Sequence, residues 1–196
     1  PKVDRMELRN KYNLPLDKPI FIYGGNLGKP QGIDFVIECF NANKDRSDCH
    51  FLVVGSGTEF GKLKQWKESN NPKNMSLYDW LPADDYHKLV ESCDVGMIFL
   101  DYRFLIPNFP SRILSYMEYK MPVIVCTDPN SDEGPIAEEH GFGKYCLSND
   151  VNAFTECLNF YVSNPVKIKS MGENGYEFLK ENYLVEHTYN TIIKHF

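Results

Sequence analysis

The sequence predicts an α/β fold, a doubly wound, Rossmann-like parallel sheet of about six strands with helices on both faces. Six short apolar runs alternate with segments of helical periodicity, as in parallel sheets. Crossover connections of this kind are right-handed, so the helices should cover both faces of the sheet. The predicted strands are 20–23, 51–54, 75–80, 95–100, 123–126 and 144–147.

The first half of the chain alternates helix and strand. Asp4 with Glu7 three residues later predicts a helix from Asp4 to about Lys11, within a lead-in segment of residues 1–17. After the first strand, apolar residues at helical spacing predict a helix over 33–40. Thr58 is the expected N-cap of a helix that ends near residue 69.

The second half continues the alternation. Pro82 ends the third strand segment, and a helix over 83–92 follows. Between the fourth and fifth strands, Pro110 can occupy the first turn of a helix that Pro122 ends. A short helix ends near residue 141, and Asp150 opens the next one. Two helices, 166–182 and 185–196, complete the chain, which is expected to be one domain over 1–196.

Composition excludes several classes of function. The 196 residues are 42% hydrophobic and 24% charged, with a net charge of −6, so nucleic acid or an anionic membrane is not the expected main partner. No apolar run approaches the roughly 20 residues that cross a bilayer. The six cysteines form no C-x-x-C pair and are expected to be reduced, in a cytoplasmic protein.

The helix between the fourth and fifth strands has a polar edge. Ser111, Ser115 and Glu118 share one face, and Arg112 lies beside it in the first turn. A helix N-terminus favours anions, so we interpret this edge as a site for a nucleotide diphosphate. Taken alone, the stretch fits an ordinary amphipathic helix with a solvated face better, because such helices are so common.

A glycine-rich turn follows the first strand at the same edge of the sheet. Its candidate ligand-binding residues are Gly24, Gly25, Asn26, Gly28 and Lys29. The spacing G-G-x-x-G is neither the dinucleotide fingerprint nor a Walker A loop, and a glycine turn can serve geometry alone. The glycine-rich turn and the start of the later helix are thus two candidate anion sites at one edge of the sheet. Together they are stronger evidence for a bound diphosphate than either is alone, since Lys29 and Arg112 could share it.

Acidic residues give no sign of a metal site. No D-x-D pair occurs, so no metal is expected and phosphate charge would be neutralised by amides, a helix dipole, Lys29 and Arg112. The sequence identifies no catalytic residue, and no cofactor is expected beyond the nucleotide-sugar substrate.

Several motifs, in this order and spacing, resemble one family. They are YGGNLGKPQG at 23–32, FLVVGSG at 51–57, WLP at 80–82, CDVG at 93–96, FPSRILSYM at 109–117 and MPVI at 121–124. Over about residues 4–196 the chain resembles the C-terminal, donor-binding half of GT-B-fold retaining glycosyltransferases of family 4. The resemblance implies that Trp80 and Leu81 contact the base, and that Pro110, Ser111 and Arg112 lie at the phosphate.

The chain departs from this family at several positions. The glutamate that binds ribose in the family maps to Ser115, and the other family glutamate maps to Pro107. An Arg and a Lys common in other members map to Asn26 and Gln31. Glu118, one turn beyond Ser115, is the candidate replacement for the ribose contact.

The resemblance implies a missing partner. Family members carry an N-terminal acceptor-binding domain, toward which the terminal helix over 183–196 would pack. We therefore expect a UDP-sugar-binding domain that is inactive by itself, in the cytoplasm or at the inner face of the membrane, in an enzyme of polysaccharide or glycolipid synthesis. The alternatives are a nucleotide-sugar epimerase on the same fold and a degenerate, non-catalytic donor-binding module.

Overall fold

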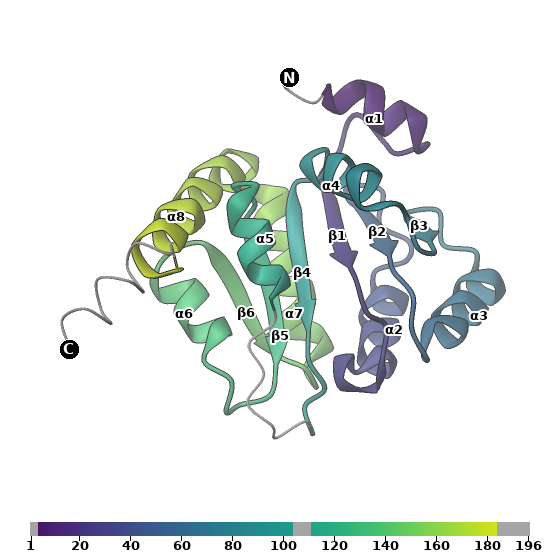
Figure 1. The fold of residues 1–196 in the computed structure, drawn as a ribbon. Helices are drawn as coiled ribbons and strands as arrows, with labels where there is room; N and C mark the ends of the chain where they lie inside the picture. Colours follow the sequence, from purple (N-terminus) through teal and green to yellow (C-terminus); the bar gives the residue numbers. More distant parts are fainter. Residues whose placement is uncertain (1–3, 104–110, 184–196) are drawn as a thin grey trace.

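The computed structural model describes residues 4–103 and 111–183, whose strands form one parallel sheet (Figure 1). The strand order is β3-β2-β1-β4-β5-β6, so the direction of winding reverses between β1 and β4. This is the doubly wound, Rossmann-like sheet that the sequence predicts. The strands are β1 (Ile20–Gly24), β2 (His50–Val54), β3 (Met75–Tyr78), β4 (Val95–Phe99), β5 (Val123–Thr127) and β6 (Gly143–Leu147).

Helices cover both faces of this sheet (Figure 1). The helices are α1 (Arg5–Lys11), the 3-10 turn η1 (Lys29–Gln31), α2 (Ile33–Ala42), α3 (Phe60–Asn70), α4 (Ala83–Glu91), α5 (Arg112–Glu118), α6 (Glu133–Glu139), α7 (Val151–Ser163) and α8 (Pro165–Tyr183). Along β1, Phe21 and Tyr23 point to the α2, α3 and α7 face, while Ile20 and Ile22 point to the α4, α5 and α6 face.

Helix α8 joins the two faces. Its first half places Met171 in the core beneath α7, and its second half places Leu179 in the core with α5. The backbone of α8 can come close because Gly172 lies against the carbonyl of Lys120. This part of the chain therefore holds the two layers together near the amino ends of the strands.

Two helix caps follow the sequence and one does not. Asp4 accepts hydrogen bonds from the N–H groups of Met6 and Glu7, at 2.9 and 3.1 Å, and Asp150 caps α7 in the same way. The predicted cap at Thr58 is wrong, because Glu59 is the N-cap residue of α3 and no side chain caps it. The Glu59 N–H donates instead to the carbonyl of Leu27 at 2.9 Å, so the loop after β1 fixes this helix start.

Two other boundaries are corrected. Strand β3 ends at Tyr78 rather than Trp80, because the Asp79 carboxylate accepts a hydrogen bond from the Trp80 N–H at 2.7 Å and the chain leaves the sheet. Helix α5 ends at Glu118, before Pro122, because Lys120 has a left-handed φ of +52°. The predicted helix over 185–196 and Pro110 lie outside the described residues.

The cysteines and the length of the helices were also subjects of the sequence predictions. All six cysteines are buried and free of disulfides. Within residues 4–103 and 111–183, no helix has the length and apolar character needed to cross a membrane.

Candidate functional site

The strand order of the sheet reverses between β1 and β4, so the carboxyl ends of these two strands mark its switch point. Strand β1 pairs with β2 over five positions but with β4 only at Phe21–Val95 and Ile22–Gly96. Beyond Ile22, the Tyr116 hydroxyl takes the place of the missing strand contact. It donates to the carbonyl of Ile22 at 3.2 Å and accepts from the Gly24 N–H at 3.3 Å. Ligands of doubly wound sheets bind at such a reversal.

Tyr116 also holds α5 beside β1 and β4. Its ring lies directly over Gly96, where any side chain would collide with it. Burial raises the pKa of Tyr116 well above its usual value, so the phenol stays protonated and keeps both hydrogen bonds. The first turn of α5, which begins with Arg112, is thereby held at the end of β1.

The glycine-rich turn over 24–28 uses most of its backbone amides within the fold. The N–H groups of Gly25 and Leu27 donate to the carbonyls of Val54 and Ser56, each at 2.9 Å, and the Gly28 N–H donates to Gln31 Oε1 at 3.0 Å. Gly25 has a φ of +110°, which favours glycine. The turn thus lets a ligand approach closely, but these amides are not free to bind phosphate as the sequence suggested.

Arg112 lies over this turn and is the strongest candidate for binding an anion. Its guanidinium carbon is 4.4 Å from the centroid of the Tyr23 ring. A methyl group on Gly25 would lie 2.8 Å from Arg112 Nη2, so the structure brings these two predicted site residues together. The side chain is partly buried.

The electrostatic surroundings keep Arg112 charged. Burial alone would lower the pKa of Arg112, but the neighbouring hydroxyls of Tyr23, Tyr116 and Tyr86 outweigh it, and the pKa lies above its usual value. Within the part of the chain that the structure describes, no carboxylate forms an ion pair with this guanidinium. A partly buried cation without an acidic partner is suited to an anionic ligand.

The other predicted residues on α5 are less closely grouped. Ser111 is exposed and makes no capping hydrogen bond, and Ser115 is partly buried. Glu118 is exposed at the last residue of the helix, about 9 Å of helical rise from Arg112. Its role as a ribose ligand stays a prediction.

Lys29 and the two predicted base contacts, Trp80 and Leu81, follow different strands of the sheet. Lys29 lines an open cavity of about 230 Å³ with Pro30, Asp101 and Arg103. Trp80 follows the edge strand β3 and is 71% exposed, so its ring is available to a ligand. Leu81 is partly buried against the α4 side of the core.

Sequence reasoning missed the tyrosines that surround Arg112. Tyr23 and Tyr116 occupy core positions of a strand and a helix, where an aromatic residue is expected for packing alone. Asp101 was also missed. It forms a bidentate pair with Arg103, and the Arg103 hydrogen bonds hold the pKa of Asp101 below its usual value. Only the spatial closeness of β1 and β4 brings these side chains to one edge.

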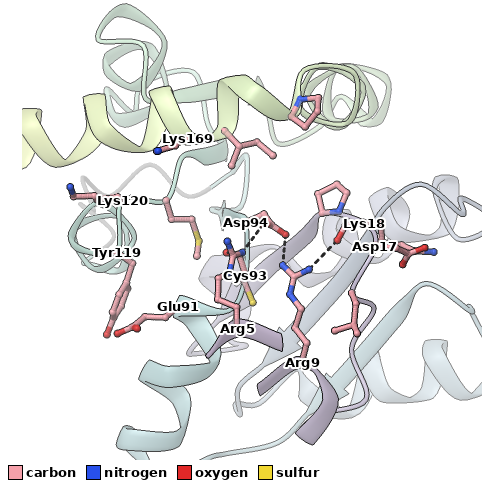
Figure 2. A pocket seen from close by; sticks show the side chains of 15 residues that line it. Arg5, Arg9, Asp17, Lys18, Glu91, Cys93, Asp94, Tyr119, Lys120 and Lys169 are labelled. Atoms are coloured by element: carbon pink, nitrogen blue, oxygen red, sulfur yellow. Dashed lines mark hydrogen bonds and ion pairs between the residues drawn. The ribbon is translucent and has the colours of Figure 1, made fainter. Parts of the chain in front are cut away.

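Two larger cavities lie at the opposite, amino edge of the sheet. One of about 540 Å³ lies between α1 and the start of α8, and one of about 630 Å³ lies beside the start of β2 and β3. Figure 2 shows the first, in which the side chains of Arg5 and Arg9 converge on Asp94, each at 2.7 Å. Because these cations already have an acidic partner, they are less suited to a free anion than Arg112 is.

Comparison with known proteins identifies the family. The family model described as "Glycosyl transferases group 1" matches residues 4–178. WcaI of Escherichia coli K12, named for glycosyl transfer in colanic acid biosynthesis, is 34% identical over 131 residues, which cover 67% of this chain and 32% of WcaI. The chain spans less than half the length of the curated relatives it matches.

Solved structures agree on the fold. Anabaena HepE in complex with UDP has a TM-score of 0.79 at 14% identity, covering 99% of this chain and 52% of that one. The C-terminal domain of the group 1 glycosyl transferase LpcC from Francisella tularensis has a TM-score of 0.67 at 18% identity, covering 94% of this chain and 95% of that domain. These neighbours show a GT-B half, a Rossmann-like α/β domain.

Proposed function

Since the chain belongs to the glycosyl transferases group 1 family, we propose that it is the nucleotide-sugar-binding domain of a glycosyltransferase of polysaccharide or glycolipid synthesis. The observation that carries the proposal is Arg112, a charged, partly buried side chain that no carboxylate pairs with in the described residues. It lies against Gly25, just beyond the end of β1, next to the strand reversal at which doubly wound sheets bind ligands.

The chemistry follows from the charge of the donor. A nucleoside diphosphate leaves as the sugar is transferred, and negative charge develops on the leaving phosphate. Arg112 can donate two parallel hydrogen bonds to phosphate oxygens and so stabilise that charge. The backbone amides of Gly25 and Gly28 donate hydrogen bonds within the fold. We therefore assign phosphate binding mainly to Arg112 and not to the glycine-rich turn.

The finer parts of the proposal rest on the resemblance. We favour a UDP-sugar donor, since HepE was crystallised with UDP, with the base at Trp80 and Leu81 and the ribose near Ser115 and Glu118. Transfer with retention of configuration, and without a metal ion, is proposed on the same ground. The groups that bind the acceptor would belong to a further domain, because this chain covers only 52% of HepE. We propose a cytoplasmic location.

Titration with UDP, GDP, ADP and CDP tests the proposal. A ligand that binds only the folded chain raises its melting temperature, and a concentration ten-fold above Kd adds about 1.4 kcal/mol of stability. We expect one diphosphate to stabilise the chain. Arg112→Ala should raise the Kd of that diphosphate at least about ten-fold, because the substitution removes a charged hydrogen-bonding group.

Arg5→Ala is the matched control, since it removes an arginine from the opposite edge of the sheet and should leave the affinity unchanged. If no nucleoside diphosphate stabilises the chain at millimolar concentration, the proposal fails. The replacement of both family glutamates by Pro107 and Ser115 would then point to the degenerate module.

A further inference from the structure

Tyr86 reaches from α4 to the end of β1. Its hydroxyl occupies the space that a side chain at position 24 would need, so a larger residue fits there only if Tyr86 moves. The ring is partly buried on the α4 side of the core, beside the second sheet face. The phenol oxygen therefore lies at Gly24, the first residue of the glycine turn, at the carboxyl end of β1.

Three tyrosine hydroxyls surround Arg112, and the fold uses two of them. Tyr23 donates to the carbonyl of Asn26 at 2.9 Å, and Tyr116 donates to the carbonyl of Ile22 at 3.2 Å. For Tyr86 Oη, no hydrogen-bond partner exists among residues 4–103 and 111–183. Because Tyr86 is only partly buried, its hydroxyl is free to donate a hydrogen bond to water or to a ligand.

The charge state of Tyr86 suits an anionic ligand. Burial raises the pKa of Tyr86 and the nearby Arg112 guanidinium opposes this, with the result above the usual value. The hydroxyl is therefore a neutral donor at physiological pH. It stands beside a cation that attracts negative charge, and a phosphate oxygen between the two would accept from both.

We propose that Tyr86 is a donor-binding residue whose hydroxyl donates a hydrogen bond to a phosphate oxygen of the nucleotide sugar, next to Arg112. The inference rests on the proposed function and extends it to a residue on another helix. It also explains Gly24 in physical terms, because a larger residue there would displace the Tyr86 hydroxyl.

Removing the hydroxyl while keeping the ring tests this inference. Isothermal titration of the 196-residue chain with UDP should show about a ten-fold weaker Kd for Tyr86→Phe, because one charge-assisted hydrogen bond is lost. Its melting temperature without ligand should stay the same, since that hydroxyl has no partner in the described part of the fold. Tyr86→Leu should weaken the binding of UDP at least as much as Tyr86→Phe does.

Tyr78→Phe is the matched control, because the Tyr78 hydroxyl donates to the carbonyl of Tyr12 at 2.7 Å. This variant should melt at a lower temperature and bind UDP as the wild type does. If Tyr86→Phe binds UDP like the wild type while Tyr86→Leu or Arg112→Ala does not, the hydroxyl contact is refuted and the proposed function stands. If the chain prefers another nucleoside diphosphate to UDP, the same variants are titrated with that one. A wild-type chain that binds none of UDP, GDP, ADP and CDP overturns both.

Discussion

At the scale of single residues, the proposed site consists of side chains whose polar groups have no carboxylate partner within the described part of the fold. Leu27 and Gly28 donate their backbone N–H groups within the protein, whereas the guanidinium of Arg112 has no acidic partner in the described residues. Arg112 and Tyr86 are thus better candidates for phosphate recognition than the glycine-rich turn.

His50 gives a residue-scale prediction that is independent of the ligand. It is only 8% exposed, and its Nε2 lies 2.9 Å from Ser76 Oγ. Burial, helped by the positive charges of Lys18 and Arg9, lowers the pKa of His50 from 6.5 to about 4. Between these values the unfolded chain binds a proton that the folded chain does not, so the free energy of unfolding must fall as the pH falls from about 6.5 to 4.

The measurement is urea unfolding of the wild type and His50→Gln at several pH values. His50 should account for a loss of about 3 kcal/mol between pH 7 and 4, an upper value for a shift of this size. The variant lacks this contribution, so its stability should fall less steeply. Parallel curves for the two proteins would show that His50 titrates normally in the folded state.

At the scale of elements, the carboxylate of Asp94 binds α1 to the amino edge of the sheet. Asp94 pairs with Arg9 and Arg5 and accepts from the Ile20 N–H, each at 2.7 Å. Arg9 also donates to the carbonyl of Ser92 at 2.9 Å and is only 7% exposed. The lead-in helix is therefore held at the start of both central strands, β1 and β4.

Replacing this carboxylate should release α1. Asp94→Asn leaves the buried charge of Arg9 without its partner, which should cost about 3 kcal/mol of stability. Hydrogen exchange should become faster at residues 5–11, measured by mass spectrometry. Arg5→Ala is the control, because this side chain is 49% exposed and its loss should cost no more than about 1 kcal/mol. Equal stability of Asp94→Asn and the wild type would contradict the role of Asp94 as the anchor of α1.

At the scale of the whole molecule, the sequence predicted the sheet better than the site. Strands β1, β2, β4 and β5 could be located because each contains a continuous apolar run, whereas β3 and β6 were recognised from shorter runs that include Ser76 and Lys144. The cap at Thr58 was wrong because the carbonyl of Leu27, distant in sequence, fixes that helix start. The packing of Tyr116 on Gly96 could not be foreseen either, because it depends on which strand lies beside β1.

The amino and carboxyl edges of the sheet differ in their cavities and in the pairing of their arginines. The amino edge holds the larger cavities, where Arg5 and Arg9 already have Asp94 as a partner, while the carboxyl edge holds Arg112 without one in the described residues. Cavity size and electrostatics therefore point to opposite ends of the sheet. We place the donor site at the carboxyl edge because its cation is unpaired in the described chain and because the strand order reverses there, between β1 and β4.

Mapping the UDP site by amide chemical shifts decides between these edges most directly. Adding UDP to the ¹⁵N-labelled chain should shift the signals of Gly25, Asn26 and Arg112, and leave those around Arg5 and Lys169 in place. Shifts confined to the amino-edge cavity, around Arg5 and Lys169, would contradict the assignment of the carboxyl edge as the donor site.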